Sequence, residues 1–209
     1  PGTISTVDRV DYSNDTATAV AKGPLSVASL RFGATGNSSF GYFGGGVTPS
    51  LISTVSRIDY SNDTATASPK GPLSGAKGYV AATGDSSFGY FAGGTTPSLI
   101  STVDRIDYSN DTATASPKGP LSGTLYRISA TGNASFGYWG GGYPEPAGDN
   151  IHRVDYSNDT ATGSIRAKLS QQRYSLAGVS ARENALPILG PALVENILRP
   201  SYPITSFGY

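Results

Sequence analysis

Few residues in this chain have side chains suited to catalysis or metal binding. The sequence has one histidine and no cysteine, which excludes disulfides, thiolate metal sites and thiol nucleophiles. The histidine, His152, takes the position of Asp8, Ser56 and Asp104 in a repeated strand pattern, and nothing beside it suggests a nucleophile. We expect His152 to be a solvent-facing substitution, and we expect no catalytic residue, no metal and no cofactor.

Carboxylates recur in the motif Asp-Tyr-Ser-Asn-Asp-Thr, which occurs four times. The motif places two carboxylates four residues apart among other oxygen donors, which suits Ca²⁺, but it lacks the ligand spacing of a known calcium loop. Asn and Asp also favour tight turns, because they tolerate left-handed backbone and hydrogen-bond to nearby amides. A structural turn is therefore the favoured interpretation.

An arginine lies two residues before the first aspartate of each motif, and hence on the same face of a strand. Such residues can pair within one sheet or between neighbouring sheets, so we expect a structural ring of ion pairs in preference to a binding site. The residues are Arg9, Arg57, Arg105 and Arg153, with Asp11, Asp59, Asp107 and Asp155.

One loop, residues 143–150, departs from the pattern of the other copies and is the first candidate for ligand or partner contact. It carries Tyr143, Glu145 and Asp149 where the other copies have Thr-Pro-Ser-Leu. Loops on a rigid scaffold are where binding residues usually lie, so these three side chains are candidate contacts. Strand order predicts that this loop shares a face with the Lys-Gly-Pro-Leu turns.

A second departure is an insertion at about residues 181–203. Pro191 at its start, apolar residues at helical spacing and Pro200 at its end predict a short amphipathic helix on the opposite face. The helix would either plug one mouth of the fold or dock on a neighbouring protein, and both alternatives stay open. Its candidate contact residues are Leu193, Val194, Ile197 and Leu198.

These residues are positioned by a tandem repeat of 48 residues. The string Tyr-Ser-Asn-Asp-Thr-Ala begins at Tyr12, Tyr60, Tyr108 and Tyr156, always 48 residues apart. The segment Ser-Phe-Gly-Tyr recurs with the same step at Phe40, Phe88 and Phe136, but its fourth copy, at Phe207, follows 71 residues later. The last repeat therefore contains 23 additional residues.

Each period contains four candidate strands. The Val-x-Arg-Val/Ile-Asp-Tyr run alternates along residues 7–12, 55–60, 103–108 and 151–156. The Ser-Asn-Asp-Thr turn leads to a Thr-Ala-Thr-Ala strand, and a Lys-Gly-Pro-Leu turn leads to an inner strand such as Tyr79–Thr83 or Arg127–Thr131. A Gly-Asn/Asp turn then reverses the chain into Ser-Phe-Gly-Tyr. The sequence thus predicts an all-β fold.

A repeat of this length with four strands and a Gly/aromatic motif is typical of a propeller blade. The strand order resembles kelch repeats, in which an aromatic strand ends in Gly-Gly, here Tyr42–Gly45. The longer strings Phe-Gly-Tyr-Phe-Gly-Gly-Gly and Ser-Thr-Val-Asp-Arg-Ile-Asp-Tyr resemble kelch-like proteins of marine bacteriophages, including cyanophages and uncultured marine viruses. This resemblance implies a structural or adhesive part of a virion and no catalytic residue.

The phase of the repeats predicts a four-bladed kelch-like β-propeller, with four antiparallel strands per blade, as a single domain over residues 1–209. The last repeat supplies an inner strand at Arg173–Val179 and a second strand at Ile204–Tyr209. The N-terminus supplies third and fourth strands at Thr3–Tyr12 and Thr16–Val20, so one blade is shared between the N- and C-termini. Closure leaves no edge strand unpaired.

Charge and hydropathy limit the classes of partner that we expect this chain to bind. The chain has 15 basic and 15 acidic residues, so no global field favours nucleic acid, and it has no apolar run long enough for membrane insertion. We expect a non-enzymatic structural or appendage module, in a virion or extracellular, contacting other structural proteins, further copies of itself or a host surface. A carbohydrate-binding propeller that contacts a cell-surface glycan is the alternative, and a kelch-type enzyme is a weaker one.

Overall fold

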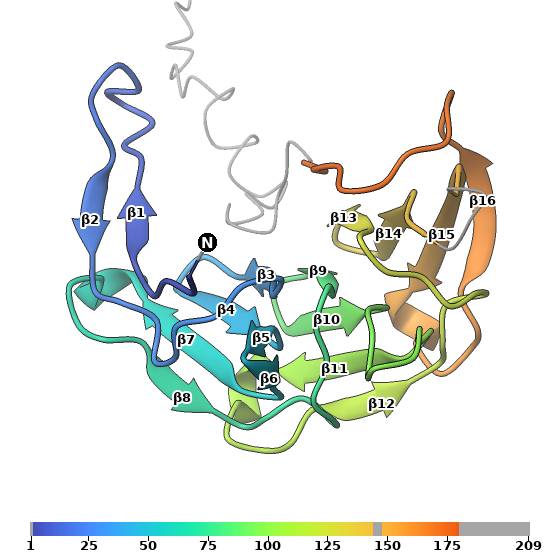
Figure 1. Cartoon of the computed structure of the whole chain (residues 1–209), viewed down its shortest axis with the longest axis horizontal. Helices are drawn as coiled ribbons and strands as arrows, with labels where there is room; N and C mark the ends of the chain where they lie inside the picture. Colours follow the sequence, from blue (N-terminus) through green and yellow to red (C-terminus); the bar gives the residue numbers. More distant parts are fainter. Residues whose placement is uncertain (1, 144–147, 180–209) are drawn as a thin grey trace, which may run out of the picture.

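The computed structural model describes residues 2–143 and 148–179, and in these residues the fold is all-β (Figure 1). Three antiparallel sheets of four strands each follow one another along the chain. Figure 1 shows them arranged along an arc, with β1 and β2 on one side of its opening and β16 on the other. The part of the chain that is described contains no helix of the length and hydrophobicity that a membrane span requires.

Each four-stranded sheet is built from one stretch of the repeat, taken in chain order from inner to outer strand. The first sheet contains β3 (Gly33–Gly36), β4 (Phe40–Gly44), β7 (Val55–Asp59) and β8 (Ser68–Lys70). The second contains β9 (Ala81–Gly84), β10 (Phe88–Ala92), β11 (Val103–Asp107) and β12 (Ser116–Lys118). The third contains β13 (Ser129–Gly132), β14 (Phe136–Gly140), β15 (Asn150–Asp155) and β16 (Ser164–Lys168).

Two further pairs of strands are shorter. At the N-terminus β1 (Val7–Arg9) pairs with β2 (Val20–Lys22), in the register Asp8 opposite Ala21. In the loop after β4, β5 (Val47–Thr48) pairs with β6 (Ser50–Leu51). The expectation of an all-β chain with repeated four-stranded antiparallel sheets is confirmed.

Side-chain caps at the turns explain why the strands end where they do. The carboxylate of Asp59 accepts hydrogen bonds from Ser61 N at 2.9 Å and Ser61 Oγ at 2.7 Å, which starts a 3₁₀ turn, Tyr60–Asn62. Asp107 and Asp155 cap the equivalent turns, Tyr108–Asn110 and Tyr156–Asn158. These hydrogen bonds lower the pKa of the Asp59 carboxyl. The turn interpretation of this motif is supported by each of the capped copies.

Aromatic side chains from the second strand of each sheet fill the space between neighbouring sheets. Tyr42 is fully buried and stacks on Tyr108 of the next sheet, with ring centroids 4.7 Å apart. Tyr90 stacks in the same way on Tyr156, at 4.6 Å. Trp139 is also fully buried and donates to the carbonyl of Ala81. Sheet-to-sheet packing therefore accounts for the aromatic residues of the repeat.

The arginine ion pairs join neighbouring sheets, but their partner is the second aspartate of the motif and not the first. Arg57 lies 2.6 Å from Asp111, and Lys70 and the Tyr42 hydroxyl contact the same carboxylate at 3.2 Å and 3.0 Å. Asp59, the predicted partner, caps its own turn, so the ion pair of Arg57 forms between sheets, which is one of the two arrangements that the sequence left open.

The same set of contacts, in which an aspartate binds an arginine and a lysine of the preceding repeat, occurs at each described contact between neighbouring sheets. We call this set of contacts the joint. Arg105 and Lys118 contact Asp159, and Arg9 and Lys22 contact Asp63. Each of these aspartates lies 54 residues after its arginine, so it belongs to the next repeat.

The predicted starts of the edge strands and of the inner strands are wrong. The edge strands begin at Ser68 and Ser116, after the Thr-Ala-Thr-Ala segments, because these segments lie against the preceding repeat, where Ala67 N donates to Pro24 O. The inner strands β9 and β13 begin at Ala81 and Ser129, two residues after the expected starts at Tyr79 and Arg127. Residues 173–179 form no strand, and the expected strand 204–209 lies outside the described residues.

Candidate functional site

A hollow with charged walls lies where the inner strands begin. It is a cavity of about 440 Å³ lined by Arg31, Tyr79, Arg127 and Ser175, four residues spaced 48 apart along the chain. The first three lie two residues before β3, β9 and β13. The apolar residues that follow them, Phe32, Val80 and Ile128, complete the wall. One position of the repeat thus delivers a side chain from each repeat to a shared space.

The backbone at these four positions is left-handed, which is unusual for residues other than glycine. The φ angles are 65° at Arg31, 59° at Tyr79, 55° at Arg127 and 53° at Ser175. Such a conformation costs about 1 kcal/mol or more for each residue with a Cβ. Hydrogen bonds hold it in place, since Tyr79 N donates to Arg31 O at 2.7 Å and Ser175 N donates to Arg127 O at 2.9 Å.

Glycine pairs at the ends of the second strands make close backbone contacts with the next repeat beside this cavity. Gly45 and Gly46 have φ angles of 72° and 115°, and Gly46 N donates to Lys77 O at 2.8 Å. A Cβ on Gly45 would lie 2.7 Å from the same carbonyl oxygen. Close approach of two backbones therefore explains the glycine-rich segment.

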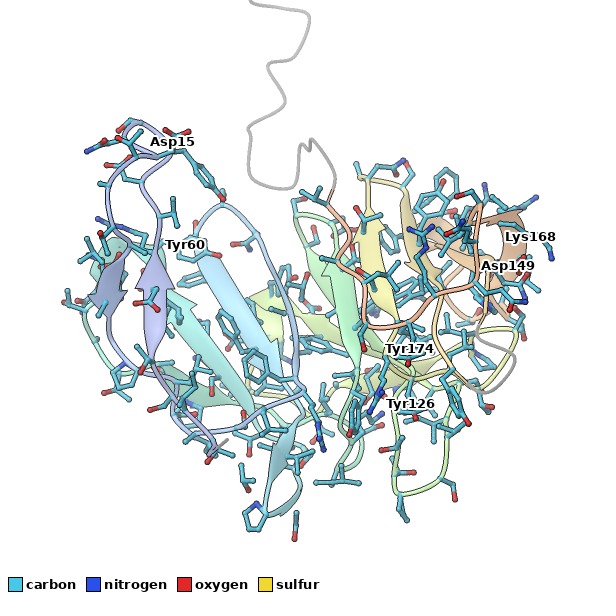
Figure 2. The ribbon with its side chains drawn as sticks, turned by 45° about the horizontal axis from the view of Figure 1, so that its top comes forward. Asp15, Tyr60, Tyr126, Asp149, Lys168 and Tyr174 are labelled. Atoms are coloured by element: carbon cyan, nitrogen blue, oxygen red, sulfur yellow. The ribbon has the colours of Figure 1, made fainter. Side chains whose placement is uncertain are left out.

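The two arginines of the cavity contact aromatic rings and no acid. The guanidinium of Arg31 lies 4.4 Å from the centroid of the Tyr79 ring. Arg127 lies 5.5 Å from Tyr79, 5.4 Å from Tyr126 and 5.7 Å from Tyr174. Figure 2 shows Tyr126 and Tyr174 close to one another. Within the described part of the chain, neither arginine has an ion pair or a side-chain hydrogen bond.

Of the predicted contact residues, Tyr143 lies next to this site. Its backbone pairs with that of Tyr126 in both directions, at 3.2 Å and 3.1 Å, and the two rings meet edge-on with centroids 5.3 Å apart. Asp149 lies 3.1 Å from Lys168, so its carboxylate is paired (Figure 2). The other predicted contact residues, Glu145, Leu193, Val194, Ile197 and Leu198, lie outside the described residues.

His152 is buried, so the expectation of a solvent-facing side chain is wrong. It is 3% exposed, and its Nδ1 lies 2.6 Å from Ser122 Oγ. Burial lowers the pKa of its imidazole. The equivalent Asp104 is also buried, where it binds Ser74 and Lys77, because this strand position points into the sheet-to-sheet contact.

Among the described residues no group of three or more His, Asp or Glu side chains is arranged to hold a metal ion. The chain matches no protein-family model, and no curated protein matches it. The chemistry of the site must therefore be argued from its own geometry.

Sequence reasoning missed the cavity residues. Arg31, Tyr79, Arg127 and Ser175 are four different choices at one position, beside stretches that are nearly identical between copies, such as Ala-Thr-Gly in the first three repeats. That contrast is the signal that would have identified them. The spacing alone does not show that the four residues meet at one cavity.

Proposed function

We propose that this chain is a non-enzymatic structural or appendage module of a phage-like virion. It is built as a four-bladed kelch-like propeller that presents loops for contact with proteins or a host surface. The observation that carries the proposal is the repeated joint between sheets, in which Asp63, Asp111 or Asp159 binds an arginine and a lysine of the preceding repeat. A joint repeated at every contact makes a rigid support, and binding loops belong on rigid supports.

Contacts at the two ends of the arc support a fourth blade shared between the termini. Segment 173–178 contacts the third sheet, where Ser175 N donates to Arg127 O. The β1–β2 pair contacts the first sheet through Asp63. The sequence motif that forms β4, β10 and β14 recurs at Ser206–Tyr209, within the predicted strand Ile204–Tyr209, which lies outside the described residues.

Side chains at the two ends of the arc that lack the contacts of their equivalents in other repeats also support closure of the arc into a ring. Tyr12 is 93% exposed, whereas the equivalent Tyr108 is buried against Tyr42. Asp15, at the tip of the β1–β2 hairpin in Figure 2, has no ion pair among the described residues, and neither has Arg153. In a ring of four repeats Asp15 would face Arg153, as Asp111 faces Arg57.

Immunogold labelling of purified particles from phage that encode the chain tests the structural role. We expect antibodies against the purified chain to label a defined part of the particle, and mass spectrometry to find the chain in those particles. Its presence in infected cells together with its absence from purified particles would contradict the role. A stoichiometric transition metal in the purified protein would contradict the non-enzymatic part of the proposal.

A carbohydrate-binding propeller is a second candidate, favoured by the tyrosines around the cavity. Tyr126 lies edge-on to both Tyr79 and Tyr143, each at 5.3 Å. Exposed edges and faces of such rings suit the apolar face of a sugar. A glycan array tests this candidate, with Tyr143→Ala expected to lose saturable binding and Tyr12→Ala, in the β1–β2 hairpin, expected to keep it.

A further inference from the structure

The two arginines of the cavity differ in what they contact from the three arginines that pair with an aspartate of the next repeat. Arg9, Arg57 and Arg105 each have a carboxylate within 2.7 Å. Arg31 and Arg127 have none among the described residues, and no residue lining their cavity is acidic. The cavity is therefore a local concentration of positive charge in a chain whose charges otherwise balance.

The aromatic contacts orient these arginines without using their hydrogen-bond donors. A ring held against the face of a guanidinium leaves the N–H groups at its edge free, and those groups bind carboxylate or sulfate oxygens in pairs. The guanidinium carbon of Arg31 lies over the Tyr79 ring, and that of Arg127 has three tyrosine rings within 5.7 Å. Both guanidinium groups thus lie near aromatic rings, and within residues 2–143 and 148–179 no side chain accepts from their donors.

The strained backbone supports a purpose for these side chains beyond folding. Glycine or asparagine would adopt a φ near 60° at lower cost, yet the four positions carry two arginines, a tyrosine and a serine. Left-handed residues that the surrounding hydrogen bonds hold in place tend to occur at ligand sites. Here the conformation turns charged and polar side chains toward one cavity.

The size and walls of the cavity suit a small organic ligand. The hollow is open to solvent, and its volume of about 440 Å³ exceeds what a bare oxyanion requires. Its apolar wall residues and the Tyr79 ring provide surface for the carbon skeleton of a ligand, while the arginines bind the charge of the ligand. A sugar ring that carries an acidic group combines these features.

We propose that the cavity formed by Arg31, Tyr79, Arg127 and Ser175 binds a saccharide bearing a carboxylate or sulfate group. The proposal of an acidic ligand is based on the two arginines, and the proposal that this ligand is a sugar rests on the carbohydrate-binding function proposed above. The acidic group lies between the two guanidinium groups, and the Ser175 hydroxyl is a further donor. The role is separate from the contribution of the chain to a particle.

Titration calorimetry of the full chain with three probes tests the proposal. The probes are D-glucuronate, D-glucose as its neutral counterpart and inorganic sulfate. We expect glucuronate to bind at least about tenfold more tightly than either of the others. Arg127→Gln and Arg31→Gln should each weaken glucuronate binding by about tenfold, and Arg166→Gln, on the exposed outer strand β16, should leave it unchanged.

The three probes separate the failure of each part. Equal binding of glucose and glucuronate would overturn the acidic preference while leaving a carbohydrate site. Sulfate binding as tightly as glucuronate would overturn the sugar part. No binding of any probe, or loss of binding in Arg166→Gln as well, would overturn the site itself, provided that thermal unfolding shows every variant to be folded.

Discussion

At the scale of single residues, the aspartate at each joint is the group on which the most contacts converge. Asp111 is buried and accepts from Arg57, Lys70 and the Tyr42 hydroxyl, and its own carbonyl accepts from Gly71 N. An ion pair out of water is stabilising as long as both partners are present, and removing one leaves the others unpaired. Burial, together with the hydrogen bond to this carboxylate, raises the pKa of Tyr42.

Replacing Asp111 should therefore be costly. We expect Asp111→Asn to lower the free energy of unfolding by about 3 kcal/mol, because Arg57 and Lys70 lose their counter-charge in a half-buried place. Asp149→Asn is the matched control: its partner Lys168 is 68% exposed, so its loss should cost less than about 1 kcal/mol. Urea unfolding measures both, and equal losses would contradict the importance of the joint.

His152 predicts a dependence of stability on pH in the range where the carboxylates no longer titrate. Burial lowers its pKa, so the unfolded chain binds the proton more readily than the folded one. Its contribution to stability is fully present above about pH 6.5, the ordinary histidine value, and is lost as the pH falls toward the lowered pKa.

The chain has a single histidine, which makes this test direct. His152→Ser imitates Ser56, whose hydroxyl lies 2.6 Å from Ser26 Oγ at the equivalent place. We expect urea unfolding between about pH 5 and pH 7.5 to show a slope in the original chain and none in the variant. The same slope in both proteins would show that His152 is not its source.

At the scale of elements, the turns between repeats are restricted by backbone contacts. Gly71 begins the Gly-Pro-Leu-Ser turn, its N–H donates to Asp111 O, and a Cβ there would collide with the carbonyl oxygen of Ala113. Gly23 and Gly119 meet Ala65 and Ala161 in the same way. The glycine of this turn is thus required by the close approach of the next repeat and not by an unusual φ angle.

Two glycines of one turn allow a matched comparison. We expect Gly71→Ala to destabilise the protein by about 3 kcal/mol, because the neighbouring backbone must move. Gly75→Ala meets nothing within 4 Å, so it should be neutral or stabilise by up to about 1 kcal/mol. Thermal unfolding distinguishes them, and a tolerated Gly71→Ala would contradict the close packing of the repeats.

At the scale of the whole molecule, the question is whether the arc closes into a ring of four repeats. A closed ring covers the sheet faces that an open arc of stacked sheets leaves exposed at both ends. Arg9, Arg57 and Arg105 already pair with an aspartate of the next repeat. A closed ring would give the fourth equivalent arginine, Arg153, such a partner as well. Closure therefore predicts coupling between Asp15 and Arg153.

A double-mutant cycle measures that coupling. For Asp15→Asn and Arg153→Gln we expect an interaction energy of about 1–2 kcal/mol, comparable to that of Arg105 and Asp159, which are 2.7 Å apart. An open arc would instead give additive effects within about 0.3 kcal/mol. The Arg105–Asp159 cycle is the positive control for the method.

The sequence by itself determined the repeat, the four strands of each of the three described sheets and their order. It did so because residue periodicity and turn chemistry act over a few residues, as the caps made by Asp59, Asp107 and Asp155 illustrate. The strand carrying Val55–Asp59 was predictable to within a residue for the same reason. Local rules also located the loop that begins at Tyr143 as a departure from the pattern.

Contacts between repeats were decided by the tertiary structure. The stacking of one sheet on the next turns Arg57 toward an aspartate 54 residues away, buries His152 and gathers Arg31 and Arg127 at one cavity. These contacts depend on the twist and offset between sheets, which spacing along the chain does not specify. The repeat therefore predicts which side chains recur, and only their arrangement in space shows which of them meet.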